Sequence, residues 1–284
     1  MFKLRSLQNI DFDLLYESFK EAFVDYEMQL NKDELQRMLT RRGFVPELSF
    51  GAFDEDKMVA FTFNGIGEFN GIKTAYDTGT GTIKKYRGEG LATKIFEYSL
   101  PFLKEAGVKQ YLLEVLQHNT KAVSLYKKLG FNVTREFNYF SQKIENIHLQ
   151  EKNTNQHYQI KSIELTQINS LGEFHDFNPS WQNSFESIFR NSVDFKAIGA
   201  FKENQLVGYC VIEPKSGDIT LLAVDKRNRR NGIGSLLFKE ALKLNQYESI
   251  KFINTEIGCD SLARFLNSIL IPLVGKQFEM IKQL

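Results

Sequence analysis

The chain has 284 residues and a mass of 32.9 kDa, enough for one large domain or two of ordinary size. Hydrophobic residues make up 42% and charged residues 25%, a composition typical of globular proteins that argues against extended disorder. Because 36 basic and 35 acidic residues leave a net charge of +1, we expect neither a nucleic-acid nor a membrane partner.

The two cysteines, Cys210 and Cys259, are too few for a disulfide framework or a cysteine zinc site, and they fit a reducing compartment. Acidic residues occupy the start of the chain, where a signal peptide needs an apolar run. Nowhere do about 18 apolar residues follow one another, the length that a membrane span requires. We therefore expect a cytoplasmic protein without a bound metal.

In the first half, apolar residues recur at helical or strand spacing in a clear order. The predicted elements are a helix over 12–23, a helix over 31–38, a hairpin over 51–61, an extended stretch over 74–83, a helix over 90–103, a strand over 111–116 and a helix over 120–129. Asp11 or Asp13 is a candidate N-cap of the first helix, and Asn31 of the second. Gly107 and Gly130 end the last two helices.

The second half follows a similar order. Its predicted elements are a hairpin over 199–209, a strand over 219–224, a helix over 233–244, a strand over 250–253 and a helix near 261–269. Between the halves, residues 141–156 are polar and lack a sustained apolar period. Strands that alternate with helices after a hairpin predict an α+β or α/β sheet with helices on both faces.

Two pairs of segments repeat in the same order. GAFDEDKMVAF begins at Gly51 and GAFKENQLVGY begins 148 residues later, at Gly199. RGEGLATKIFEYSL begins at Arg87 and RRNGIGSLLFKEAL begins 142 residues later, at Arg229. Because the offsets are nearly equal, we predict a duplicated domain. The expected boundaries are 1–142 for the first domain, 143–156 for a linker and 157–284 for the second domain.

In each half a glycine-containing turn follows a strand and opens a helix. Glycine lets backbone N–H groups approach an anion, and the helix adds its unpaired N–H groups and positive dipole end. Basic residues gather at both turns, namely Lys84, Lys85 and Arg87 in the first half and Lys226, Arg227, Arg229 and Arg230 in the second. Neither turn is a P-loop or a dinucleotide fingerprint. A pyrophosphate site is favoured, and the alternative is a helix-starting turn with a solvated basic rim.

Both turns, Arg-x-x-Gly-x-Gly/Ala, resemble the acetyl-CoA pyrophosphate loop of the GNAT (Gcn5-related N-acetyltransferase) family. Downstream, residues 119–131, NTKAVSLYKKLGF, resemble that family's N-x-x-A-x-x-L-Y-x-x-x-G-F segment. The resemblance covers nearly the whole chain as two GNAT-like domains in tandem. It implies an α+β fold in which each domain has a mixed, mostly antiparallel sheet with helices on both faces.

The function that the resemblance implies is transfer of an acetyl group from acetyl-CoA to a primary amine of a small molecule or peptide. The alternative is an acyl-CoA-binding or sensing module with little or no turnover, at least in the C-terminal half. We expect a monomer or a homodimer.

The resemblance also implies which residues hold the cofactor. In the first half they are Thr82, Ile83, Arg87, Gly88, Glu89, Gly90, Leu91, Ala92, Thr93 and Asn119. In the second half they are Val224, Arg229, Arg230, Asn231, Gly232, Ile233, Gly234 and Ser235. In this family the fourth strand splays from the fifth, and residues 79–83 would line the thioester arm. The alternatives are a β-bulge or turn at 79–83 and a helix N-cap at Asn119.

For catalysis, the resemblance assigns Tyr126 to proton donation as the thiolate leaves. An ordinary core aromatic is the alternative, since Tyr126 lies on the apolar face of its predicted helix. A base is also needed, because an alkylamine with a pKa of about 10 is mostly protonated at neutral pH. Asp77 is the expected base. Other candidates are Asp25, Glu27, Glu114 and His118.

The second half departs from the pattern. In a rough alignment Asp260 replaces the Asn, Asn267 replaces the Tyr, and Ile271 with Pro272 stands in place of Gly-Phe. We therefore expect the first half to be the main catalytic domain, although Tyr209 and Cys210 remain candidates in the second. The acceptor is expected near Phe23, Asp25, Tyr26 and Glu27, with residues 179–183 in the comparable place of the second half. Simple loop packing is the alternative for both segments.

Overall fold

The computed structural model describes residues 2–26, 29–149 and 158–284. The chain forms two compact units, which we call unit 1 (Met1–Thr134 with Phe278–Leu284) and unit 2 (Arg135–Gln277). Glu27 and positions 150–156 of the predicted linker lie outside the described residues.

Unit 1 is built on a sheet in the order β1-β2-β3-β4-β5. Its strands are β1 (Lys3–Ser6), β2 (Phe50–Asp54), β3 (Lys57–Phe69), β4 (Ile72–Thr82) and β5 (Gln110–Leu116). Neighbouring strands are antiparallel except β4 and β5, which are parallel. Its helices are α1 (Phe12–Ala22), α2 (Lys32–Arg42), α3 (Leu91–Glu105) and α4 (Thr120–Lys128).

Unit 2 repeats this arrangement in the order β7-β8-β9-β10-β11-β6. The strands are β7 (Gln159–Ile163), β8 (Lys196–Lys202), β9 (Gln205–Glu213), β10 (Asp218–Val224), β11 (Ser249–Glu256) and β6 (Asn132–Lys143). Among the strand pairs formed by the described residues of unit 2, β10 and β11 are parallel and the others are antiparallel. The helices are α5 (Phe185–Arg190), α6 (Ile233–Leu244) and α7 (Asp260–Ser268). The predicted fold, two mixed and mostly antiparallel sheets in tandem, is confirmed.

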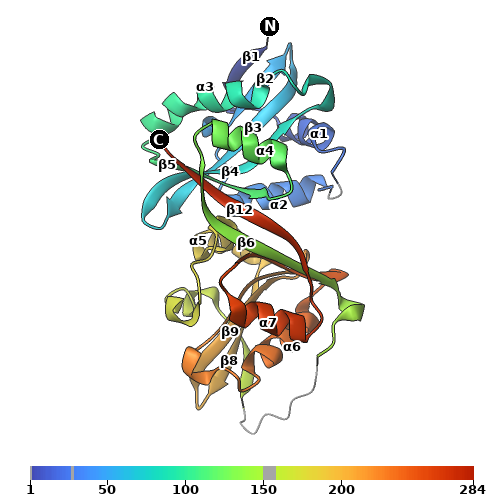
Figure 1. The fold of residues 1–284 in the computed structure, drawn as a ribbon, viewed down its shortest axis with the longest axis vertical. Coiled ribbons are helices and arrows are strands. Elements are labelled where there is room, and N and C mark those ends of the chain that lie inside the picture. The colour runs from blue at the N-terminus through green and yellow to red at the C-terminus, as the bar shows by residue number, and fades with distance from the viewer. Residues whose placement is uncertain (1, 27–28, 150–157) are drawn as a thin grey trace. The chain divides into compact units, whose positions relative to one another are not determined.

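Unit 1 is not contiguous in sequence, because its last residues follow unit 2 in the chain. Strand β6 follows the last helix of unit 1, yet its residues 137–143 pair with β11 of unit 2. The final strand, β12 (Leu273–Gln283), follows the last helix of unit 2, but residues 278–284 belong to unit 1. There Met280 is fully buried and the Leu284 N–H donates to the Lys109 carbonyl at 2.9 Å. Figure 1 shows the C terminus beside β5.

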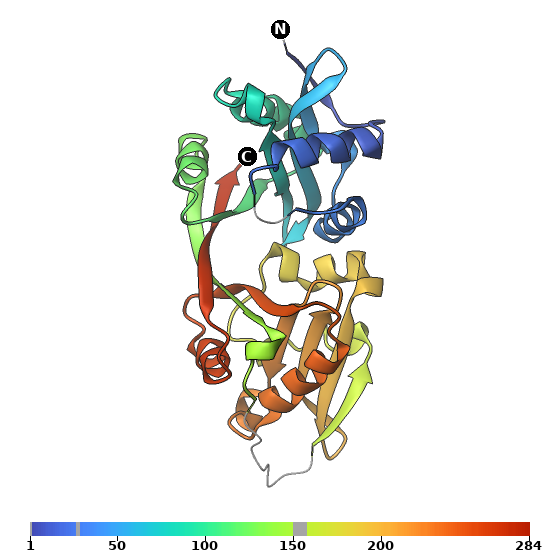
Figure 2. The ribbon, with the colours of Figure 1, turned by 90° about the vertical axis from the view of Figure 1, so that its right-hand side faces the viewer.

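Helices cover both faces of the unit 1 sheet (Figure 2). On one face α1 and α2 bury Leu15, Phe19, Leu35 and Leu39 against aromatic residues of β3. On the other face α3 and α4 pack on β2, β3 and β5. The helix starts follow their capping chemistry, because Asp11 accepts a hydrogen bond at the start of α1 and Asn31 forms a capping box with Glu34 at α2.

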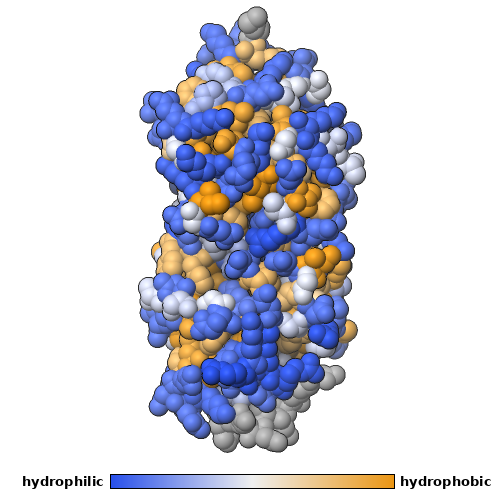
Figure 3. Space-filling model, turned by 60° about the vertical axis from the view of Figure 1, so that its left-hand side comes forward, coloured by the Kyte–Doolittle hydropathy of each residue, from blue (hydrophilic) through white to orange (hydrophobic). Residues whose placement is uncertain are grey.

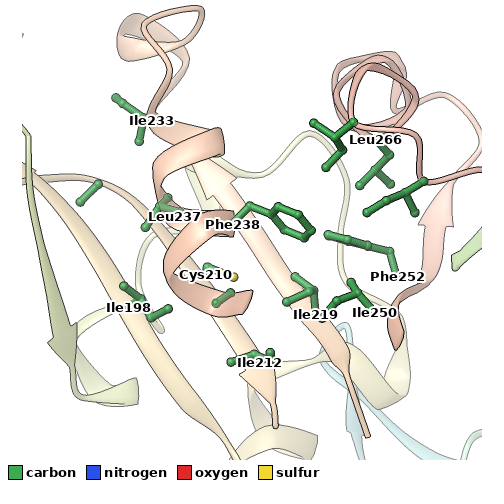
Figure 4. Packing of buried hydrophobic residues seen from close by; sticks show 14 of the residues in the cluster. Ile198, Cys210, Ile212, Ile219, Ile233, Leu237, Phe238, Ile250, Phe252 and Leu266 are labelled. Atoms are coloured by element: carbon green, nitrogen blue, oxygen red, sulfur yellow. The ribbon is translucent and has the colours of Figure 1, made fainter. Parts of the chain in front are cut away.

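The largest apolar cluster of unit 2 lies between its sheet and helices α6 and α7. Leu237, Phe238 and Ala241 of α6 are fully buried there, together with Leu266 of α7 (Figure 4). The opposite face buries a second cluster around Tyr209 and Ile188. Each unit therefore has its own core.

Hydrophilic residues predominate on the molecular face seen in Figure 3, with apolar patches between them. Within the described ranges, none of the helices combines the length and the apolar character needed to cross a bilayer.

Candidate active site

Strand β4 carries a bulge next to the point where it parts from β5. Parallel pairing with β5 runs from Thr74 to Tyr76, and the described residues of β4 beyond Tyr76 form no pair with β5. On the other side, Phe63 pairs with Gly79 and Asn64 with Asp77, so Thr78 is the extra residue. A bulge bends its strand and re-aims the neighbouring side chains. The parting of β4 from β5 agrees with the splay that the resemblance implies, whereas the bulge lies at Thr78, just before the stretch 79–83 for which a bulge or turn was the alternative.

Asp77 and Tyr126 meet at this bulge. The Tyr126 hydroxyl donates to Asp77 Oδ2 at 3.1 Å, and the Thr80 hydroxyl donates to the same oxygen at 2.8 Å. The other carboxylate oxygen, Oδ1, is buried without a hydrogen-bond partner among the described residues. Two residues that are 49 positions apart, and that the sequence assigned to base and acid, are thus in direct contact.

Burial changes the acidity of both groups. It raises the pKa of Asp77 above its ordinary value, against the opposing effect of hydrogen bonds from Thr80, Tyr126 and the Gly79 backbone. Burial, and then the nearby Asp77 charge, hold the pKa of Tyr126 well above 10. The pair therefore favours protonated forms and can hold a proton in a site that largely excludes water.

Further polar side chains surround the pair. Thr62 Oγ1 lies 3.2 Å from Thr80 Oγ1, and the Tyr111 hydroxyl donates to Asn64 Oδ1. Arg42 donates to the Thr78 carbonyl at 3.0 Å and favours ionisation of Asp77. This network has no signal in the sequence. Alternation along β4 would place Thr80 on the opposite face from Asp77, and only the bulge at Thr78 brings the two together. Tyr111 and Asn64 are 47 residues apart with no local signal.

The other candidate bases lie elsewhere. Asp25 forms ion pairs with Lys84 and Arg87. Its hydrogen bonds to Lys84 and then to Arg87 lower its pKa, so Asp25 is a weaker base than an unpaired carboxylate. Glu114 accepts a hydrogen bond from Tyr76 at 3.1 Å. His118 is exposed, directly before the N-cap of α4. Among these described candidates, Asp77 alone is hydrogen-bonded to Tyr126.

The predicted pyrophosphate turn of unit 1 is open. Gly88 and Gly90 have φ angles of 91° and 70°, and a Cβ at either position would meet no atom within 4 Å. Helix α3 starts directly afterwards, with no side chain capping its first N–H groups. Thr82 is the last residue of β4 and Ile83 follows it, and Leu91, Ala92 and Thr93 form the first turn of the helix. Asn119 is the N-cap of α4 and accepts from the Ala122 N–H, so the capping alternative for it is confirmed.

Unit 2 has the same turn. Arg230 and Gly232 have φ angles of 66° and 83°, and α6 begins directly after Gly232. Arg230 thus adopts the left-handed conformation that glycine supplies at position 88 of unit 1.

The chemistry beside the two turns differs. In β10 the extra residue of the bulge is Thr220, so Ile219 occupies the place of Asp77. The N-cap of α7 is Cys259, and Ile271 N–H donates to Leu266 just as Phe131 N–H donates to Tyr126. Cys259 and Leu266 therefore stand where Asn119 and Tyr126 stand in unit 1. The rough alignment that placed Asp260 and Asn267 there was wrong by one residue.

A cavity of about 630 Å³ opens in unit 2 between the splayed strands. Of the residues predicted to hold the cofactor, those that line it are Val224, Arg229, Arg230, Gly232, Ile233, Gly234 and Ser235. Apolar side chains such as Ile219, Phe252 and Phe265 make up much of the rest. Tyr209 is hydrogen-bonded to His175, and burial raises the pKa of both Tyr209 and Cys210. The Tyr209 hydroxyl and the Cys210 thiol therefore stay protonated.

Two family models match the chain. The model of the acetyltransferase (GNAT) family matches residues 12–131, and that of an acetyltransferase (GNAT) domain matches residues 155–261. Among solved structures, a tandem GNAT protein from the clavulanic acid pathway superposes with a TM-score of 0.74 at 10% identity, covering 100% of this chain and 98% of that one. A GCN5-related N-acetyltransferase from Sphaerobacter thermophilus gives 0.73 at 13% identity over 99% and 95%.

Curated relatives match parts of the chain. N-alpha-acetyltransferase 30 of Schizosaccharomyces pombe is 34% identical over 87 residues, which are 30% of this chain and 58% of that protein. N-alpha-acetyltransferase MAK3 of Arabidopsis thaliana is 30% identical over 123 residues, which are 42% and 63%. The chain thus spans less than two thirds of the length of either relative.

Proposed function

This chain belongs to the GNAT acetyltransferase family, with two such domains in tandem, and from that premise we propose that unit 1 transfers the acetyl group of acetyl-CoA to a primary amine of a small molecule or peptide. The observation that carries the proposal is the contact between Tyr126 and Asp77 inside a partly buried polar network. The names of the two curated relatives support an acceptor of the N-alpha-amine type.

Unit 1 offers a fitting place for acetyl-CoA. The open turn at Gly88 and Gly90 and the first N–H groups of α3 suit a pyrophosphate, because they supply donors and a positive dipole end without obstruction. Beyond Tyr76, β4 leaves backbone groups that β5 does not pair, and these suit an amide-containing arm. When bound, acetyl-CoA supplies an activated acyl thioester and a thiolate leaving group.

In this proposal the two side chains move one proton from the acceptor nitrogen to the leaving sulfur. Asp77, as carboxylate, accepts the proton that the attacking nitrogen loses, and its Oδ1 has no hydrogen-bond partner among the described residues. Tyr126 donates its hydroxyl proton to the sulfur and recovers one from Asp77 through their hydrogen bond. The raised pKa of Asp77 suits a base that must work near neutral pH.

An acceptor screen tests the proposal. The protein is mixed with acetyl-CoA and a panel of amines that includes polyamines, amino acids and peptides with unmodified N termini, and released thiol is followed. We expect at least one amine to raise thiol release well above the hydrolysis background. A flat response over the whole panel, in protein shown by calorimetry to bind acetyl-CoA, would count against transfer and favour binding alone.

A second function is favoured for unit 2, namely binding of acyl-CoA without turnover. The supporting observation is that a cavity lies beside the turn while Ile219 and Leu266 occupy the places of the proton-handling pair. Calorimetry separates the units, because Gly90→Glu and Gly232→Glu each place bulk and negative charge at one turn. We expect each variant to lose one binding site and only Gly90→Glu to lose transfer. Two intact sites in Gly232→Glu would exclude binding at the unit 2 turn.

A further inference from the structure

The cavity of unit 2 is lined by residues from both faces of its sheet. Ile219 and Phe252 belong to the apolar cluster beneath α6 and α7 (Figure 4), which we call the near side. Leu221 and Ala223 belong to the cluster on the opposite face, the far side. One space borders both clusters because the described residues of β10 pair with β11 at a single position, Asp218. The cavity therefore crosses the sheet at the splay.

The near side is open and cationic at the turn. Gly232, the first residues of α6 and the exposed Arg230 and Arg264 border the cavity there. This end suits the pyrophosphate of the proposed ligand. Between Val224, beside the turn, and Ile219, strand β10 extends about 16 Å along the cavity. A linear molecule anchored at the turn is thereby led down the splay and toward the far side.

The far side offers an apolar surface. Phe174, Leu221 and Ala223 are buried side chains of the far-side cluster and line the cavity. Phe177 and Pro179, which follow Phe174 closely in the chain, are half-buried and line it as well. The apolar lining thus continues beyond the splay, past the place where the near side ends.

Polar side chains that border this part of the cavity are already engaged within unit 2. His175 is hydrogen-bonded to the Tyr209 hydroxyl, and burial lowers its pKa, so that it is uncharged near neutral pH. Asn183 donates to a backbone carbonyl of β11 at 2.8 Å, and Asn254 bonds two side chains at 2.9 Å each. The Asp176 carboxylate pairs with an arginine at 2.8 Å. A polar ligand group would have to break such bonds at a cost, whereas an apolar group leaves them intact.

We propose that unit 2 binds an acyl-CoA whose acyl chain is several methylene groups long, with the chain passing through the splay to the far side. The inference rests on the proposed binding of acyl-CoA by unit 2 and names the acyl group that the site takes. An acetyl group has a single methyl group with which to cover the far side, while a longer chain removes both apolar surfaces from water. Ile219 and Leu266, in the places of Asp77 and Tyr126, fit a site that holds the chain without transferring it.

Chain-length preference is measured by calorimetry with CoA, acetyl-CoA and octanoyl-CoA. The full chain carries Gly90→Glu, which blocks the turn of unit 1 and keeps that of unit 2. We expect octanoyl-CoA to bind at least about tenfold more tightly than acetyl-CoA, since each buried methylene group is worth up to about fourfold. Gly232→Glu, which keeps only the turn of unit 1, is the matched control and should show no such preference. The same preference in Gly232→Glu would overturn the assignment to unit 2.

The path of the chain is tested by narrowing the far side in the Gly90→Glu background. Leu221→Phe and the smaller change Ala223→Val should each bring the ratio of the octanoyl-CoA and acetyl-CoA affinities toward one, and Ala223→Val serves where Leu221→Phe does not fold. Leu165→Phe is the control, because Leu165 packs against the same cluster but is not among the described residues that line the cavity. It should keep the ratio. An unchanged ratio in the narrowed variants would overturn the far-side path.

Failure of this inference is distinct from failure of the proposed function. Equal affinity of Gly90→Glu for acetyl-CoA and octanoyl-CoA overturns the chain-length inference and leaves binding of acyl-CoA by unit 2 in place. If Gly90→Glu binds none of the three ligands while Gly232→Glu keeps one site, the proposed function of unit 2 fails, and the inference fails with it.

Discussion

The two units share their backbone devices but not the chemistry of their interiors. Both have a bulge at the same place in the splayed strand, two left-handed residues in the turn, and an arginine that donates to two backbone carbonyls and an aspartate. Strand pairing and helix starts then match the polar residues of unit 1 with apolar ones of unit 2 at six places. These are Asp77 and Ile219, Thr80 and Leu222, Thr62 and Cys210, Asn64 and Ile212, Tyr111 and Ile250, and Tyr126 and Leu266.

The exchange of a whole network, rather than of single residues, has a physical reason. Removing one member of a buried hydrogen-bonded set leaves its partner unsatisfied, which costs about 1–3 kcal/mol, whereas replacing all members with apolar residues builds a core. Five of the unit 2 counterparts, among them Ile219 and Leu266, pack together in Figure 4. The backbone scaffold of the turn and bulge is therefore separable from the polar side chains beside it.

Tyr126→Phe gives the largest expected effect. It removes the hydroxyl that, in the proposed mechanism, donates to the leaving sulfur, so kcat should fall by about 10²- to 10⁴-fold, the usual contribution of general acid–base catalysis. Acetyl-CoA affinity by calorimetry should stay unchanged. The matched change in unit 2, Leu266→Met, should leave transfer intact. Equal turnover in Tyr126→Phe and the wild type would mean that the polar interior of unit 1 is not the reaction centre.

Asp77→Asn tests the base and its burial together. We expect kcat to fall by about 10-fold or more, since a carboxamide cannot accept the proton. The sign of the stability effect follows from the raised pKa of Asp77. Folding favours its protonated form, so its stabilising contribution is present below the unfolded-state pKa and is lost as pH rises through the folded-state pKa.

Urea unfolding as a function of pH measures this contribution. The stability of Asp77→Asn relative to the wild type should therefore increase as pH rises from acidic toward neutral values. The counterpart variant Ile219→Val should keep the pH dependence of the wild type. A pH-independent difference between Asp77→Asn and the wild type would show that burial does not raise the pKa of Asp77.

The smallest effect concerns the second position of the turn. A left-handed conformation costs a residue with a Cβ about 1 kcal/mol, although glycine loses more entropy on folding. Gly88→Ala should destabilise unit 1 by up to about 1 kcal/mol, and Arg230→Gly should stabilise unit 2 by a similar or smaller amount. Chemical denaturation resolves both changes. The same sign for the two variants would contradict the equivalence of the turns.

Much of this architecture is readable from local signals. The repeat, the two turns, and the caps at Asp11 and Asn31 each involve neighbouring residues, and so does the match of residues 119–131 to the family segment. Asp77 was selected as the best-placed acid near the turn, and its contact with Tyr126 supports that choice.

The remainder depends on contacts that have no local signature. Nothing near Arg87 shows that its guanidinium reaches Ala22, 65 residues earlier. In unit 2 the residues that usually mark helix ends are missing. Cys259 precedes α7 without a side-chain hydrogen bond to the helix, and Leu270 takes a left-handed φ of 61° where unit 1 has Gly130. A register shift in β11 near Asn254, with a φ of 58°, further disguises the correspondence. The alignment error at Asp260 and Asn267 follows from these substitutions.

The placement of residues 278–284 in unit 1, after all of unit 2 in the chain, has a consequence for biosynthesis. Met280 fills the interior of unit 1, and Leu284 closes its edge at Lys109, yet these residues leave the ribosome after all of unit 2. Unit 1 is therefore translated first but completed only after unit 2 has been made, and until then its core is unfilled. A translation product cut short before residue 278 lacks part of the domain that was made first.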